Sequence, residues 1–208
     1  MFSEVLESLI ELTGYTPEDA QTLSETYSVT SQWADEFAKA FYDTLFAYPP
    51  TAAVFRPGER PARERTLKDW YLRVTRGDID EEFWLWQWRV GLIHIPRRVP
   101  NDYMLGMMSR VQQLFLQKCM AAWEPTQAVR VFLAFKRVTD VVAGLIAEGY
   151  MRGHQLAMKE LLGFRQELLD RMIDMEVDTL VERLMNLSIK ASAHRESRAS
   201  GGGEVHSP

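Results

Sequence analysis

Histidine and cysteine are the residue types here that most readily bind metals or act as nucleophiles, and both are scarce. The 208 residues contain four histidines and one cysteine, Cys119. This set cannot assemble a closed zinc site of the usual composition. The sequence also lacks a glycine-rich phosphate loop and a nucleophile elbow. Any site must therefore depend on single side chains.

His94 is the histidine whose surroundings suggest a function. It ends the tryptophan-rich stretch 84–94, and on a helix it shares a face with Gly91 and with positions 87 and 90. We expect Gly91 to leave an open space one turn below the imidazole, against which a flat ligand could lie. A core histidine bonded to a carbonyl is the alternative, and periodicity alone favours it. The remaining histidines lie in polar stretches or near the C-terminus: His154, His194 and His206.

Charge and hydropathy exclude several classes of protein. Lys and Arg total 24 and Asp and Glu total 29, which gives a formal net charge of −5. This balance provides no electrostatic footprint for nucleic acid or for an anionic membrane surface. No window holds 18 uninterrupted apolar residues, and the N-terminus has no secretory pattern. We expect a cytoplasmic protein with neither partner, and Cys119 as a small core residue.

The elements that must position His94 are helices, and the predicted fold class is all-α. Apolar residues recur at steps of three and four nearly everywhere. Residues 56–62 form the clearest loop, since two prolines and a glycine interrupt them. Pro96 and Pro100 also punctuate the chain, and the helix 81–95, apolar on almost every face, is expected to be buried. Apolar spacing and capping signals predict a helix ending at Gly14, then helices at about 17–27, 31–48, 63–76, 81–95, 101–123 and 126–187.

Four motifs resemble the globin domains of globin-coupled sensors and protoglobins, over roughly residues 5–155. The first three are similar to the turn after an extra N-terminal helix, the distal aromatic-tyrosine signature and the distal helix: Leu12–Asp19, Phe41–Leu45 and Thr66–Lys68. The fourth resembles the proximal segment: Val90–His94, followed by Arg97–Met104. The resemblance implies a globin-like three-over-three helical sandwich, with an extra N-terminal helix and a long C-terminal helical extension.

The resemblance also implies a haem b cofactor. His94 would be the proximal axial ligand, and Tyr42 on the opposite face would donate a hydrogen bond to a bound diatomic gas. A neutral imidazole leaves the sixth position of ferrous iron open. Thr66 and Leu67 would lie over the iron, with Leu67 as a hydrophobic lid. Residues 56–76 contain no histidine, so that helix cannot supply a second axial imidazole.

Other parts of a haem pocket follow from the same resemblance. Guanidinium groups pair well with carboxylates, so three arginines are candidates for the haem propionates, although each could simply be solvated: Arg63, Arg97 and Arg98. Soft methionine side chains suit a porphyrin wall and an ordinary core equally: Met104, Met107 and Met108. The tryptophans at positions 84, 86 and 88 are better suited to packing, some of it at a subunit contact, than to a redox relay.

A C-terminal amphipathic helix is expected at 160–189, after a globin domain at 1–159 and before a disordered tail at 190–208. Its apolar stripe has heptad-like spacing: Leu162, Leu169, Ile173, Val177, Leu180, Leu184 and Leu187. In sensor relatives the corresponding segment leads to an output domain, whereas here the chain ends. We therefore expect a homodimer through the final two long helices, with a separate signalling protein as a further possible partner.

The expected function is reversible binding of O₂, and also of NO and CO, by a haem globin that acts as a gas sensor or ligand-binding protein. Two alternatives remain open at this point. One is a nitric-oxide dioxygenase or peroxidase that uses an external reductase. The other is a globin-fold scaffold without haem, which would have no need of His94 or of the space at Gly91.

Overall fold

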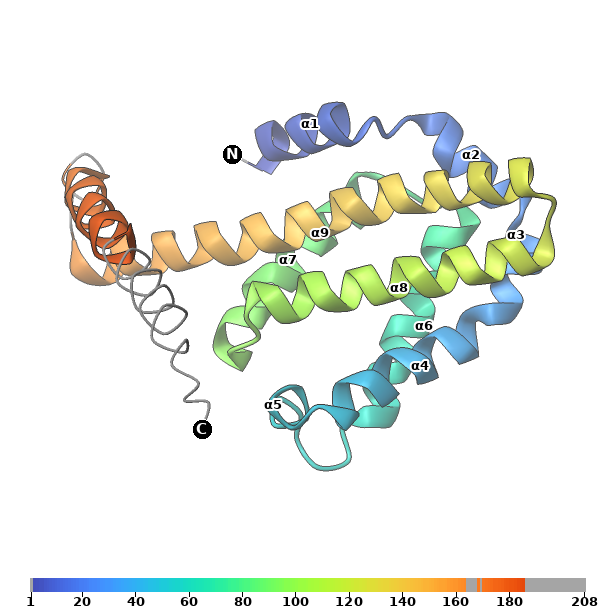
Figure 1. The fold of residues 1–208 in the computed structure, drawn as a ribbon, viewed down its shortest axis with the longest axis horizontal. Coiled ribbons are helices and arrows are strands. Elements are labelled where there is room, and N and C mark those ends of the chain that lie inside the picture. Colours follow the sequence, from blue (N-terminus) through green and yellow to red (C-terminus); the bar gives the residue numbers. More distant parts are fainter. Residues whose placement is uncertain (1, 164–167, 169, 186–208) are drawn as a thin grey trace, which may run out of the picture. The chain divides into compact units, whose positions relative to one another are not determined.

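The computed structural model describes residues 2–163, 168 and 170–185. The all-α prediction is confirmed, since the described residues form helices joined by turns (Figure 1). In chain order the elements are α1 (Phe2–Thr13), α2 (Pro17–Glu25), α3 (Tyr27–Thr30), the 3₁₀ turn η1 (Ser31–Trp33), α4 (Ala34–Ala47), α5 (Pro49–Ala52), α6 (Arg60–Arg76), α7 (Glu81–Arg97), α8 (Asn101–Ala122) and α9 (Pro125–Leu162).

An aromatic core joins the long helices. α8 and α9 run side by side (Figure 1), and the rings of Phe115 and Phe135 stack between them at 3.8 Å. α4 and α6 meet through stacked Phe37 and Tyr71, 4.5 Å apart. The Tyr71 hydroxyl donates to the Thr30 carbonyl at 2.9 Å, so this buried polar group is satisfied. Cys119 is fully buried in the same core, as predicted.

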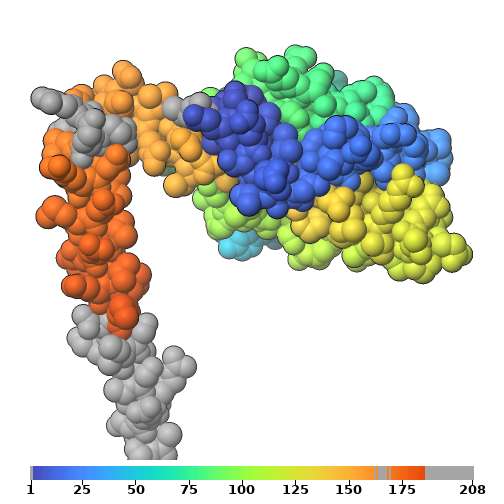
Figure 2. All heavy atoms as spheres, turned by 90° about the horizontal axis from the view of Figure 1, so that it is seen from above, coloured from blue at the N-terminus to red at the C-terminus, as the bar shows by residue number. Residues whose placement is uncertain are grey.

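α1 covers the junction of α7 and α9. In the space-filling view of Figure 2, α1 appears as the dark blue surface over these helices. The ring of Phe2 meets Trp88 of α7 edge-on at 5.8 Å, and the end of the Leu9 side chain lies against Gly144 of α9, where a Cβ would be 2.4 Å from the Leu9 Cδ2. Among the described residues, none of the helices has both the length and the apolar stretch needed to cross a bilayer.

Two predicted boundaries are wrong, and proline is the reason in both cases. α6 begins at Arg60 inside the predicted loop 56–62, because Pro61 falls in the first helical turn, where a backbone N–H has no helical partner. Pro96 lies within α7 instead of ending it. It removes a hydrogen bond in the last turn only, and the helix stops at the next residue.

The prediction that the tryptophan helix is buried all round is also wrong. Asp80 caps α7 by accepting a hydrogen bond from the Phe83 N–H at 2.7 Å. Trp84 is 5% exposed, whereas Trp86 is 46% and Ile93 is 44% exposed. α7 therefore packs through one face and leaves the other accessible.

The predicted continuous helix to residue 187 is interrupted. α9 ends at Leu162, and Gly163 follows with a left-handed φ of 65°. Glycine adopts this conformation without the Cβ clash that other residues suffer. Residues 168 and 170–185 are again helical, while Leu169, Leu187 and the predicted tail 190–208 lie outside the described residues. The chain divides into two compact units, Met1–Gln155 and Leu156–Pro208.

Candidate functional site

A cavity of about 300 Å³ lies among α4, α6, α7 and α8, with α9 closing one side. Its volume falls within the range of small-molecule sites, and most of its walls are aliphatic or aromatic. Seven of the nine predicted site residues line it: Tyr42, Arg63, Thr66, Leu67, His94, Arg97 and Met107. Met104 and Met108 line it as well.

His94 brings a half-buried imidazole to the wall formed by α7. Burial lowers its pKa, and the positive charge of Arg97 lowers it further, so the ring is neutral at pH 7. Its Nδ1 is buried and has no hydrogen-bond partner. This nitrogen therefore does not match the alternative prediction, in which His94 is a core histidine bonded to a carbonyl. A neutral imidazole with an unsatisfied ring nitrogen suits metal ligation.

Tyr42 enters the same cavity from α4. It is 7% exposed and packs edge-on against Phe41 and Phe55, with ring centroids 5.2 and 5.8 Å away. Burial raises the pKa of its phenol to about 12, so the hydroxyl keeps its proton at physiological pH. Within the described part of the chain, this hydroxyl makes no hydrogen bond that would occupy it. It can therefore donate to a small ligand in the cavity.

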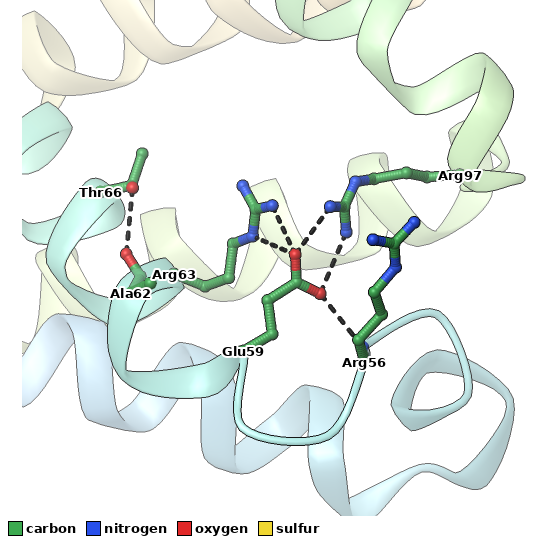
Figure 3. A network of polar contacts seen from close by, with 6 residues as sticks. All are labelled: Arg56, Glu59, Ala62, Arg63, Thr66 and Arg97. Carbon is green, nitrogen blue, oxygen red and sulfur yellow. Dashed lines mark hydrogen bonds and ion pairs between the residues drawn. The ribbon is translucent and has the colours of Figure 1, made fainter.

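Thr66 and Leu67 line the cavity from α6. Leu67 packs in a small apolar cluster with Tyr42 and Met107. The Thr66 hydroxyl donates to the Ala62 carbonyl of its own helix at 3.1 Å (Figure 3). Its proton is thus already used, and the oxygen remains as an acceptor.

Gly91 does not face the cavity, and the reason for selecting it was wrong. A Cβ at this position would lie 2.2 Å from the Ile146 carbonyl oxygen and 2.8 Å from the Tyr150 nitrogen, both on α9. A Cβ on Gly149 would lie 2.5 Å from the Trp88 carbonyl oxygen. α7 and α9 therefore touch backbone to backbone at a pair of glycines. The space that Gly91 leaves is filled by a helix, with no room for a ligand.

The three candidate arginines have different surroundings. Arg63 on α6 and Arg97 on α7 both line the cavity, and both bind the carboxylate of Glu59 (Figure 3). Arg98 is exposed, ends α7 with a φ of 54°, and is not among the residues that line the cavity. The expectation that it meets a ligand carboxylate has no support in this geometry.

Several residues of the site were not predicted from the sequence. Glu59 had one available signal, its position four residues before Arg63, which suits an ion pair on a helix. Gln87 is 2% exposed, lines the cavity and donates to the Phe83 carbonyl at 2.9 Å. Its place on the His94 face was the signal there. Most of the other additions are apolar or aromatic wall residues that resemble any core position, among them Phe55, Trp70, Val99 and Tyr103.

Any metal ion at His94 must bring most of its own ligands. Within the described ranges, no three His, Cys, Asp or Glu side chains gather where they could hold an ion. The cavity instead offers one neutral imidazole, the phenols of Tyr42 and Tyr103, and mostly apolar walls. This combination suits a metal carried by a larger, mostly apolar group.

Comparison with known proteins identifies a family for most of the chain. Residues 3–155 match the model of the Protoglobin family. This confirms the resemblance found in the four sequence motifs. A search of curated protein sequences finds no match.

Two solved structures share the fold. The globin domain of a Geobacter sulfurreducens globin-coupled sensor superimposes with a TM-score of 0.64 at 20% identity, covering 69% of this chain and 96% of that one. The globin domain of E. coli DosC, in a ferric form, gives a TM-score of 0.57 at 12% identity and covers 72% and 99%. At these identities the matches concern the fold, and the predicted globin-like architecture is confirmed.

Proposed function

Because this chain belongs to the protoglobin family, we propose that its cavity binds haem b and that the protein is a gas-sensing globin. The observation that carries this proposal is the pairing of His94 and Tyr42 on the walls of one apolar cavity. When bound, haem supplies an iron with an open coordination position that accepts O₂, NO or CO. The two structural neighbours, the globin domain of a globin-coupled sensor and a ferric globin domain, support this role.

The residues present fit such a group. His94 would hold the iron, because its imidazole is neutral and its buried Nδ1 has no hydrogen-bond partner in the described structure. The phenol of Tyr42 donates a hydrogen bond to the gas ligand, and Leu67 excludes water from it. Attachment through cysteine thioethers needs a CxxCH pattern, and a chain with one cysteine cannot form it. That cysteine, Cys119, is fully buried in the core. We therefore propose non-covalent attachment.

An absorption spectrum tests this proposal directly. The purified chain, reconstituted with ferric haem, is expected to show a Soret band that shifts on reduction and again on adding CO. A chain that retains no haem after reconstitution would leave the haemless scaffold as the remaining reading of the fold.

We also propose that two copies pair through the second unit. In the helical residues 170–185, the side chains of Ile173, Val177, Leu180 and Leu184 are between 45% and 63% exposed. Their spacing of three and four places them on one helix face. A monomer rarely leaves such an apolar row in water, and pairing two helices would bury it.

Light scattering on the full chain tests this pairing. Leu180→Glu places a charge within the row and is expected to convert the dimer to a monomer. Met175→Glu is the matched control, because Met175 is 73% exposed and lies on the opposite face of the helix. A full chain that is monomeric at tens of micromolar would contradict the proposed dimer.

A further inference from the structure

Glu59 connects two walls of the cavity by binding an arginine from each. It lies at the N-terminus of α6 and is 14% exposed. Its Oε1 accepts from the Nε and Nη2 of Arg63 at 3.0 and 2.5 Å, and from the Nη2 of Arg97 at 2.7 Å. Its Oε2 accepts from the Nη1 of Arg97 at 3.2 Å and from the Arg56 backbone N–H at 3.1 Å (Figure 3). One carboxylate thus receives five hydrogen bonds.

These contacts have the geometry of specific carboxylate recognition. Arg97 presents two parallel N–H groups to the two oxygens, the bidentate arrangement that guanidinium favours. Arg97 and then Arg63 hold the pKa of Glu59 well below its usual range, so the carboxylate stays ionised. Arg63, Arg97 and the Arg56 backbone N–H thus form a carboxylate-binding site, and a side chain of the protein itself occupies it.

The location of this carboxylate-binding site ties it to the cavity. Arg63 lines the cavity from α6, and Arg97 lines it from α7, three residues after His94. A planar ligand that His94 holds and that carries carboxylates on its edge would meet Arg63 and Arg97 as its cationic partners. Both arginines already form ion pairs with Glu59.

We propose that Glu59 is a placeholder carboxylate, which occupies Arg63 and Arg97 and competes for them with the carboxylates of a porphyrin. This inference rests on the proposed haem function. Glu59 offsets part of the positive charge of both guanidinium groups and occupies the N–H groups that it accepts from, so the intact chain discriminates weakly between a porphyrin diacid and its neutral ester. Removing the Glu59 charge releases both arginines and restores that discrimination.

Iron-free porphyrins separate this effect from ligation by His94. We would titrate the apo chain with protoporphyrin IX and with its dimethyl ester, following quenching of the tryptophans, of which Trp70 and Trp86 line the cavity. Glu59→Gln keeps the size of the side chain and is expected to lower the Kd for the diacid by about three- to tenfold, as for a partly exposed ion pair. The Kd for the ester should not change.

Two further variants assign the gain to the arginines. Glu64→Gln removes a negative charge five residues further along α6, but Glu64 pairs with Arg60 and makes no hydrogen bond or ion pair with Arg63 or Arg97 in the described structure. It should leave the ratio of the two Kd values as in the parent chain. In the double variant Glu59→Gln/Arg97→Gln, the gain for the diacid should be largely lost.

The outcomes distinguish a failure of the placeholder role of Glu59 from a failure of haem binding. An unchanged or weaker affinity of Glu59→Gln for the diacid, relative to the ester, would overturn the placeholder role and leave Glu59 as a structural tie between α6 and α7. Circular dichroism verifies folding. Should the glutamine variant unfold, Glu59→Asp, whose shorter side chain cannot reach both arginines, should raise the diacid preference in the same direction. If neither iron-free porphyrin binds the parent chain, the same titrations with ferric haem and its dimethyl ester decide the placeholder role, and a chain that binds neither form of haem contradicts the proposed haem function.

Discussion

Helix α7 is used in two different ways within one helical turn. At Gly91 its backbone touches the backbone of α9, and a single added carbon would lie 2.2 Å from the Ile146 carbonyl oxygen. At His94 the same helix presents a side chain to a cavity of about 300 Å³. From the sequence, both residues suggested one flat ligand. The structure separates them into a sealed helix crossing and an open site.

A glycine on an apolar helix thus indicates that another group approaches the backbone closely, but it does not identify that group. Ligand and helix backbone both need the missing Cβ. The two regions are still connected, because Ile146, whose carbonyl lies against Gly91, also lines the cavity. The crossing therefore determines how close α9 comes to the site that His94 serves.

The largest expected effect is at His94. His94→Ala removes the neutral imidazole and should abolish stable haem binding, since the rest of the cavity wall offers no nitrogen ligand beside it. Haem content after reconstitution and the CO difference spectrum measure this. Retention of the parent ferrous and CO spectra without added imidazole would show that another group ligates the iron.

Tyr42→Phe gives the next largest effect. A hydrogen bond to a partly charged acceptor is worth about 1.5–3 kcal/mol, so the O₂ dissociation rate should rise by about tenfold to a hundredfold. Bound CO is less polar, and its dissociation should change much less. Stopped-flow ligand replacement measures both rates. Equal increases for both gases would indicate wider access to the cavity, with no lost hydrogen bond.

Gly91→Ala tests the sealed crossing. The new Cβ would force apart two helix backbones, which costs about 1–3 kcal/mol and lowers the Tm of the apo chain by about 2–12 °C. Gly106→Ala is the matched control, because a Cβ there meets nothing within 4 Å and alanine is the better helix former. If Gly91→Ala left the Tm unchanged but weakened haem binding, the original ligand interpretation would be restored.

The helices were largely predictable, and the errors have local causes. Apolar spacing located the longer helices α1, α2, α4, α6, α7, α8 and α9, and it missed the four-residue helices α3 and α5, which are too short to show a period. It missed the break at Gly163, because glycine adopts a left-handed backbone conformation without steric cost and the apolar period continues past it. It also overestimated the burial of α7, since Trp86 and Ile93 face the cavity side rather than a neighbouring helix.

The site was predictable only in part. The family motifs brought His94 and Tyr42 to one cavity although they are far apart in the chain. The Glu59 contact with Arg97 spans 38 positions and depends on how the loop before α6 meets the end of α7. No local pattern encodes that meeting. The exposure of Arg98 likewise follows from its left-handed position at the helix end.

The smallest expected change concerns pH and tests how dry the cavity is compared with the sealed crossing. Desolvation raises the pKa of Tyr42 to about 12, against an ordinary value near 10. The protonated phenol is the donor, so the donor persists until the pH approaches that raised value. The ratio of O₂ dissociation rates between Tyr42→Phe and the parent chain should therefore stay constant from pH 7 to about pH 10. A ratio that falls toward one within this range would mean that water reaches the phenol, and that the cavity, unlike the crossing at Gly91, is solvated around its donor.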